Sequence, residues 1–463
     1  MKMLHRALLP KSLPLILRGT ALSLLLCAGA IHAADQYILP SGTGSKTGAS
    51  WQDARPGTKA DFQAAWDALT PGDALYVGSG NYEGVGISAS KGGAEGKPLR
   101  LIGVDRGAGL PLLTSNFDKH NPAKTGATFF EAKFGTSDFD IEGFRLKGYR
   151  CGIFLRGRHA NINISKLNVE EAREGIRSEA GGTPQNPTSA THDVTVSDCQ
   201  FIKFTKRGIR LEGGNYHWKI ERCLADAGGK EWATEPFHMG FQIANKSLKT
   251  SSFEHHIEFI DCVARNSYNE APKGKSYWNG DGFSVEANVT NMRYLRCTSM
   301  HNTDGGWDDK SDGPEFIDCV SIDNKENFRL WSKNLRPKMK NVLSAFAFKR
   351  GGSGPQTGLW ILGNLEAENC TFLGNSTHIV AEEGKAMPDA RLVFRNCLFA
   401  DGNPGSMANA QTENCIVSAP AEKRQDLGIT ARKDTAWTKE VNAFNSTKYP
   451  DKGFSNSRWG HSH

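Results

Sequence analysis

The sequence predicts an all-β fold, a single-domain parallel β-helix with a capping helix near its N-terminus. Two observations carry this prediction. A unit of about 22 residues recurs between Phe144 and Cys415, and each unit combines short β-rich pieces with turns. Glycine accounts for 50 of the 463 residues, about 11%, against an average of roughly 7%. Such an excess suits a fold that needs many tight turns.

Cysteines mark one position of the repeating unit. Phe144, Leu167 and Val342 occupy the same position in units that lack the cysteine. We expect these side chains to form a column of small apolar groups in the core, stacked about 4.8 Å apart, rather than a disulfide framework. The sequence has no Cys-x-x-Cys pair, which argues against a zinc site. The cysteines of the column are Cys199, Cys223, Cys262, Cys297, Cys319, Cys370, Cys397 and Cys415.

Residues 1–33 have the features of an export signal. Four basic residues precede a short apolar run, Ala21–Ala30, and Ala33 offers a small residue for cleavage. We therefore expect a secreted or periplasmic protein without a membrane span, since the run is shorter than the ~20 residues that a spanning helix needs. The leader carries four of the positive charges, so the net charge of +6 falls to +2 in the mature chain. This charge gives no indication of nucleic-acid binding.

The rest of the chain divides into two predicted regions. Residues 34–419 form the β-helix domain, and its first part, about 34–85, is the N-terminal cap. Within the cap, Phe62, Ala65, Trp66 and Leu69 have the spacing of an amphipathic helix over residues 61–69, which we expect to cover the open end of the β-helix. Residues 420–463 are polar and irregular, and we expect a C-terminal cover or tail.

A second column follows from a glycine, or its equivalent, that precedes an apolar-x-apolar triplet. Alternation along a strand predicts that the middle residue of each triplet points outward. In two adjacent coils this pattern brings together Asp281, Asp304 and Asp308, with Asp309 as a further carboxylate. Several carboxylates without histidine or thiolate favour a hard cation such as Ca²⁺. The outward column reads Phe154, Arg177, Arg210, Gln242, Ser284, Asp308, Arg329 and Trp360.

Three asparagines recur five residues after a cysteine. They are Asn302, Asn324 and Asn375. Asparagine tolerates left-handed backbone angles, so we expect these residues to form a ladder at a turn.

Three segments resemble the core of polysaccharide lyase family nine, the pectate lyase type. They are Asn279-Gly-Asp-Gly-Phe283, Asn302-Thr-Asp-Gly-Gly-Trp-Asp308 and Asn327-Phe-Arg-Leu330. The resemblance implies a right-handed parallel β-helix and a lyase, an enzyme that cleaves a uronic-acid-containing polysaccharide by calcium-assisted β-elimination. An acidic polysaccharide would then be the binding partner, and we expect the protein to be a monomer.

The resemblance also implies roles for individual residues. Asp281, Asp304 and Asp308 correspond to calcium ligands, Asp309 is a further candidate, and Gly305 stands where the family has another aspartate. Arg329 stands where the family has its catalytic lysine. Lys310 and Lys333 are fallback bases or substrate contacts, and we expect the remaining substrate contacts from Arg207, Arg210 and Trp307.

Other functions stay open at this point. Asn302-Thr-Asp-Gly305 also matches a motif of polygalacturonases, hydrolases that need two separated carboxylates. The next coil offers only Asn324-Lys-Glu326 in place of the paired aspartates of those enzymes. A non-catalytic polysaccharide-binding protein is a second alternative, favoured by Gly305 and by arginine at position 329. An epimerase would be a variant of the lyase chemistry.

Overall fold

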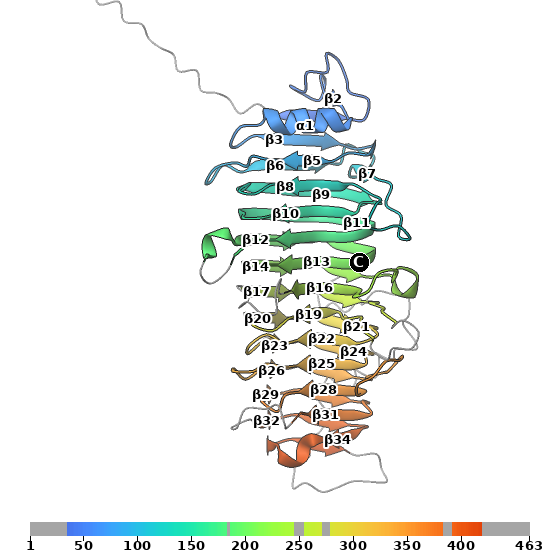
Figure 1. Cartoon of the computed structure of the whole chain (residues 1–463), viewed down its shortest axis with the longest axis vertical. Helices are drawn as coiled ribbons and strands as arrows, with labels where there is room; N and C mark the ends of the chain where they lie inside the picture. Colours follow the sequence, from blue (N-terminus) through green and yellow to red (C-terminus); the bar gives the residue numbers. More distant parts are fainter. Residues whose placement is uncertain (1–34, 183–185, 245–253, 271–277, 383–390, 419–463) are drawn as a thin grey trace, which may run out of the picture. The chain divides into compact units, whose positions relative to one another are not determined.

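The computed structural model describes residues 35–182, 186–244, 254–270, 278–382 and 391–418. The predicted leader and the predicted C-terminal region from residue 420 lie outside the described residues. Within them, the strands pair side by side in parallel register and form a parallel β-helix, as predicted (Figure 1). Each coil contributes strands to three ladders, and the long strands β9, β11 and β13 bend from one ladder into the next. Among the described residues no helix is long and apolar enough to cross a membrane.

The first ladder carries the outward column identified in the sequence. It consists of β5 (Ile87–Ala89), β8 (Thr128–Ala132), β10 (Cys151–Arg156), the ends of β11 (Ala160–Glu179) and β13 (Gln200–Glu212), β16 (Met239–Ala244), β19 (Phe283–Val285), β22 (Gly305–Asp309), β25 (Glu326–Leu330), β28 (Thr357–Ile361), β31 (Thr377–Ala381) and β34 (Asn403–Gly405).

The second ladder precedes the cysteine of each coil. It consists of β1 (Gln36–Leu39) with β2 (Arg55–Pro56), β3 (Ala74–Gly78), β6 (Leu99–Val104), the starts of β9 (Phe139–Lys147) and β11, β12 (Thr191–Ser197), β14 (Asn215–Glu221), β17 (His255–Ile260), β20 (Thr290–Leu295), β23 (Glu315–Ile317), β26 (Lys338–Lys340), β29 (Leu365–Glu368), β32 (Leu392–Arg395) and β35 (Gln411–Glu413).

The third ladder follows the cysteine. It consists of β4 (Asn81–Glu83), β7 (Leu112–Thr114), the end of β9, the middle of β11, the start of β13, β15 (Leu224–Asp226), β18 (Val263–Arg265), β21 (Thr298–Met300), β24 (Val320–Ile322), β27 (Leu343–Ala345), β30 (Thr371–Leu373), β33 (Leu398–Ala400) and β36 (Ile416–Ser418). Short 3₁₀ turns lie at Pro187–Ser189, Gly229–Glu231 and Ser406–Asn409.

The predicted helix is present as α1 (Lys59–Ala68). Thr58 caps its N-terminus by accepting a hydrogen bond from the backbone N–H of Asp61. Its buried face includes Phe62 and Trp66, and the Trp66 ring packs edge-on against Phe130 at 5.1 Å between centroids. The helix therefore covers the first coils of the core, where an open sheet edge would otherwise be exposed.

The cysteine column lies at the corner between the second and third ladders. Every cysteine of the described residues is a buried free thiol, as the repeat predicts. The residue directly before the cysteine adopts a left-handed backbone, for example Asp261 (φ 52°) and Arg296 (φ 53°), and this conformation turns the chain from one ladder to the next. The Arg296 guanidinium also bonds the Asp261 carboxylate across the two coils, with Nη2 at 2.8 Å from Oδ2.

The asparagine ladder exists, but its predicted conformation is wrong. The left-handed residues are the preceding ones, His301, Asp323 and Gly374, whereas the asparagines themselves are buried and bond from coil to coil. Asn324 Oδ1 accepts from both the backbone N–H and the side-chain amide of Asn302, at 3.0 and 2.9 Å. The sequence pattern identified the column and missed its purpose, which is to satisfy backbone groups inside the corner.

The buried thiols give a first prediction. We expect the native mature protein to show no measurable reaction with a thiol reagent, and all nine cysteines to react after denaturation, because folding buries each of them. A reductant should leave the melting temperature unchanged. Rapid labelling of the native protein, or a melting temperature that falls on reduction, would contradict the stacked-thiol column.

The asparagine ladder gives a second prediction. Asn324→Ala removes the acceptor of the Asn302 backbone N–H and leaves buried polar groups unpaired. We expect the free energy of unfolding to fall by about 2–4 kcal/mol, measured by urea denaturation. Asn163→Ala is the control, because this exposed asparagine donates to the Asp140 side chain on the surface of the second ladder. Equal effects for the two variants would refute the ladder's role.

Candidate functional site

The outward column of the first ladder has the register that the sequence predicts. Phe154 pairs with Arg177, Arg177 with Arg210, Arg210 with Gln242, and the column continues through Ser284, Asp308, Arg329 and Trp360. The residues directly before each glycine or its equivalent, Asp281, Gly305 and Glu326, are adjacent as well, because Gly305 pairs with Glu326 and the Gly282 N–H donates to Gly305 O. Asp281, Asp308 and Arg329 therefore lie on adjacent coils of one ladder.

Alternation along β22 separates the residues that the motif places together. Asp308 belongs to the outward column, but Trp307 and Asp309 point inward. The Trp307 ring is fully buried and stacks between Phe283 and Phe328, with centroids 4.8 and 4.9 Å apart. The prediction that Trp307 contacts substrate is therefore wrong. Asp309 serves the core, where it accepts hydrogen bonds from Tyr294 Oη at 2.7 Å and from the Ser311 N–H at 2.8 Å.

Two cations hold the Asp308 carboxylate. Lys310 Nζ lies 2.9 Å and Arg329 Nη1 lies 3.3 Å from Asp308 Oδ2. Lys310 also contacts Glu286 Oε2 at 3.4 Å. The side chains of Lys310 and Arg329 are 21% and 13% exposed, so both cations reach the surface, whereas Asp308 is buried.

A third cation, missed in the sequence, holds Asp304. Lys325 Nζ forms an ion pair with Asp304 Oδ1, lies 3.4 Å from Glu326 Oε1 and donates to Ser353 O at 2.9 Å. The side chains of Lys325 and Asp304 are each only 3% exposed. The sequence contained a signal for this ion pair. Gly305 is in register with Glu326, so Asp304 and Lys325, which directly precede them, must also lie side by side.

Asp281 has no cation partner among the described residues. Its Oδ1 accepts the Gly305 N–H at 2.8 Å, and its Oδ2 is buried without a hydrogen-bond partner. A side chain at position 305 would bring its Cβ within 3.1 Å of Asp281 Oδ1, so glycine allows this close approach. Burial, followed by repulsion from Asp304 and Asp308, raises the pKa of Asp281 well above its ordinary value.

Arg329 packs against two aromatic rings that also contact each other. Its guanidinium carbon is 4.1 Å from the centroid of Trp331 and 4.8 Å from that of Trp360. Burial by itself would lower the pKa of Arg329, but the carboxylates of Asp308, Glu326, Asp281 and Asp304 outweigh it and raise this pKa above its ordinary value. Arg329 is therefore a fixed positive charge at neutral pH.

The carboxylates in this arrangement do not fit a calcium site. Calcium takes six to eight oxygen ligands, and among the described residues no group of three or more acidic, histidine or cysteine side chains is arranged to hold a metal ion. Asp304 and Asp308 bind the chain's own cations, and Gly305 offers no side-chain oxygen. Asp281 Oδ2 and Asp308 Oδ1 are among the buried oxygens that have no hydrogen-bond partner in the described part of the chain.

The remaining predicted residues differ in accessibility. Arg207 is buried, and it donates to Gln242 Oε1 at 2.6 Å and to the carbonyl oxygen of Phe237, so the prediction that it contacts substrate is wrong. Arg210 stays partly exposed on the outward column and pairs with Glu212 at 3.0 Å. Lys333 is exposed in the turn after β25.

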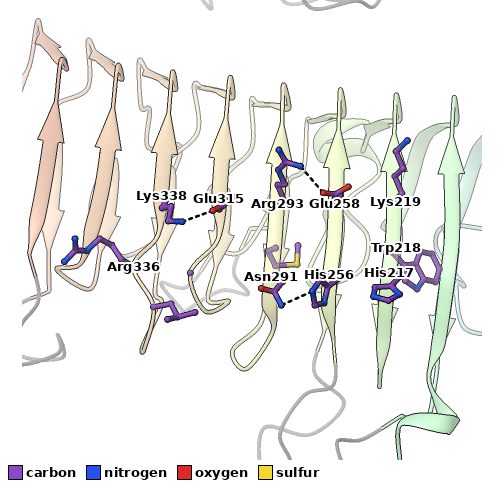
Figure 2. A pocket seen from close by; sticks show the side chains of 13 residues that line it. His217, Trp218, Lys219, His256, Glu258, Asn291, Arg293, Glu315, Arg336 and Lys338 are labelled. Atoms are coloured by element: carbon purple, nitrogen blue, oxygen red, sulfur yellow. Dashed lines mark hydrogen bonds and ion pairs between the residues drawn. The ribbon is translucent and has the colours of Figure 1, made fainter.

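A groove of about 680 Å³ lies elsewhere, on the second ladder (Figure 2). Acidic and basic side chains alternate along it and pair with each other, as Arg293 does with Glu258 at 3.2 Å and Lys338 with Glu315 at 3.0 Å. This alternation stabilises the ladder's register. The groove contains none of the charged residues described above, the Asp308–Arg329 cluster, which consists of Asp281, Asp304, Asp308, Lys310, Lys325, Glu326 and Arg329.

Glu326 provides a pH-dependent prediction. Burial, followed by repulsion from Asp304, raises its pKa from the ordinary 4.5 to about 8. The folded state thus holds this proton more tightly than the unfolded state, so the stability that the proton provides is present below pH 4.5 and is lost as the pH rises through about 8. We expect Glu326→Gln to be more stable than the wild type at pH 9 by about 2–4 kcal/mol, and to differ little at pH 4.5.

Urea denaturation at both pH values measures this difference. Glu315→Gln, at an exposed position of the second ladder, is the matched control and should not become relatively more stable at high pH. A Glu326→Gln stability difference that is the same at pH 4.5 and pH 9 would refute the raised pKa.

Comparison with known proteins adds information on the fold. No family model and no curated protein matches the sequence. The structure is similar to that of pectate lyase Pel9A, with 15% identity over 77% of this chain and 80% of that chain and a TM-score of 0.45. It is also similar to the periplasmic alginate epimerase AlgG, with 11% identity over 75% of this chain and 77% of that one and a TM-score of 0.43. A tailspike protein of Acinetobacter baumannii bacteriophage Fri1, a capsular polysaccharide depolymerase, has 10% identity over 83% of this chain and 62% of that chain, with a TM-score of 0.43.

Proposed function

We propose that this protein is a polysaccharide lyase that cleaves a uronic-acid-containing polysaccharide by β-elimination. One observation carries the proposal: β19, β22 and β25 bring the three segments that resemble family nine onto adjacent coils of one ladder, with Asp308 and Arg329 in register. The sequence-based leader prediction supports a site of action outside the cytoplasm, where such a polymer would be met.

The charges of the site suit the difficult step of this reaction. A lyase removes the proton at C5 of the uronic acid and expels the substituent at O4, and negative charge develops on the sugar carboxylate as the proton leaves. Fixed positive groups that meet this charge stabilise the enolate-like intermediate. Arg329 and Lys310 are positive, partly exposed and held by Asp308, so we assign to them the binding and neutralisation of the substrate carboxylate.

Arg329 is a poor candidate for the proton acceptor. A general base works best when its pKa lies near the working pH, and the surrounding carboxylates raise the pKa of Arg329 further from neutrality. Lys310, a predicted fallback, also has a raised pKa, because the attraction of Asp308 and Glu286 outweighs its burial. Lys333, exposed in the turn after β25, stays the remaining candidate for the base.

Two tryptophans extend the site beyond the charges. Trp331 and Trp360 are partly exposed, and their rings lie edge to face at 5.3 Å. Trp360 is fixed by a 3.0 Å hydrogen bond from Nε1 to Glu382 Oε1. Aromatic side chains beside a few placed charges are typical of a ligand site, so we infer that a sugar ring packs against this pair. Arg329 separates these rings from Asp308.

An assay for the new C4–C5 double bond tests the lyase. The mature protein is incubated with a panel of uronic polysaccharides, with calcium and with a chelator, and ultraviolet absorbance is followed. We expect absorbance to rise with at least one polymer and to fall by about 10²-fold or more in Arg329→Ala, because a charge-stabilising group is lost. Arg329→Lys, which keeps a positive charge, should retain more activity than Arg329→Ala.

Arg293→Ala on the second ladder is the matched control, since this arginine makes a surface ion pair away from the cluster. Full activity in Arg329→Ala would remove the site from the mechanism. New reducing ends without absorbance would identify a hydrolase, inverted uronic acid units an epimerase, and binding without any product a polysaccharide-binding protein.

A further inference from the structure

We propose that Lys325 is a built-in cation that occupies the position of a metal ion in this site, so that the protein neither needs nor binds calcium there. The part of the proposal that says calcium is not needed for turnover rests on the proposed lyase function. The part that says calcium does not bind rests only on the described side chains and is tested without any substrate.

The ammonium group of Lys325 has all its partners inside the protein. An ammonium has three N–H donors, and Lys325 Nζ meets Asp304, Glu326 Oε1 at 3.4 Å and Ser353 O at 2.9 Å. Its side chain is only 3% exposed. This buried ammonium already neutralises the Asp304 carboxylate, so a calcium ion at Asp304 would have to displace Lys325.

The main chain fixes Lys325 beside Asp304. The Lys325 N–H donates to Asp304 O at 3.0 Å, and Lys325 O accepts the Thr357 N–H at 3.0 Å. These bonds extend the first ladder by one residue, because Lys325 directly precedes the start of β25. The register of the two strands therefore places Lys325 beside Asp304, as it places Arg329 beside Asp308 four residues further along.

The other two predicted ligands are placed in the same way. Asp308 shares its Oδ2 between Lys310 and Arg329, and Asp281 gives its Oδ1 to the Gly305 N–H. At position 305, where Asp281 approaches the main chain, this protein has a glycine and therefore no carboxylate. Each of the three aspartates thus has its own positive or hydrogen-bonding partner within the chain, and Lys325 is the partner that is buried most deeply among the three cations.

Calcium titration of the mature protein tests the proposal. After dialysis against a chelator, we expect the wild type to show no heat of binding by calorimetry. We also expect no change in its melting temperature with about 5 mM CaCl₂, a concentration above the dissociation constants of typical extracellular calcium modules. Lys325→Met keeps the length of the side chain and removes the charge. Its melting temperature should fall in chelator and recover by about 2–6 °C when calcium is added.

Two controls isolate the position. Lys325→Met combined with Asp304→Asn removes both charges and should not respond to calcium. Lys338→Met removes an exposed lysine of the second ladder, paired with Glu315, and should behave like the wild type.

Saturable calcium binding by the wild type at one equivalent would overturn the proposal, and this measurement needs no variant to fold. A folded Lys325→Met protein that does not respond to calcium would overturn the assigned position of the cation. A third outcome is that calcium leaves the wild type unchanged and stabilises Lys325→Met while no polymer is cleaved. This outcome would refute the lyase function and support the built-in cation.

Discussion

The register of the parallel ladders is the constraint on which the rest of this structure depends. Strands in a ladder lie about 4.8 Å apart, and a slip of one residue would turn every outward side chain into the core. Two devices fix the length of each coil: left-handed residues such as Asp261 turn the corner before the cysteine, and Asn302 and Asn324 bond from coil to coil inside the next corner. Where Ala347 interrupts the asparagine column, Asn327 reaches across to Asn375 and closes the gap.

This spacing also forces charges together. Carboxylates on adjacent coils of one ladder repel each other, and burial strengthens the repulsion because water no longer screens it. The chain answers with cations placed by the same register: Lys325 beside Asp304, and Arg329 beside Asp308. Where no cation is supplied, as at Asp281, the raised pKa keeps the carboxyl protonated to a higher pH. Lys325 thus balances charge inside the protein, whereas Arg329 and Lys310 reach the surface.

The sequence predicted the columns well because they repeat. Period-two alternation and the glycine positions were enough to place Asp308 and Arg329 in register, and the cysteine contexts were enough to identify a core column. Isolated features were harder to predict. Trp307 was expected to contact substrate, yet alternation from Asp308 alone puts it in the core. Lys325 was missed because it precedes its strand, where alternation no longer assigns a direction to the side chain, although the register of Gly305 with Glu326 already places it beside Asp304.

The ion pair between Arg329 and Asp308 links this electrostatic balance to function. A sugar carboxylate that approaches Arg329 must share the guanidinium with Asp308 Oδ2, which already lies 3.3 Å from Nη1. The guanidinium carries five N–H donors, so it can keep Asp308 on one edge and receive the substrate on another, while Trp331 and Trp360 hold its plane. Asp308 then fixes the direction of the arginine and weakens its field at the same time. Under the proposed lyase function, a site built on such a pair would favour orientation of the substrate over tight binding, and a long charged polymer could then be released after each cleavage.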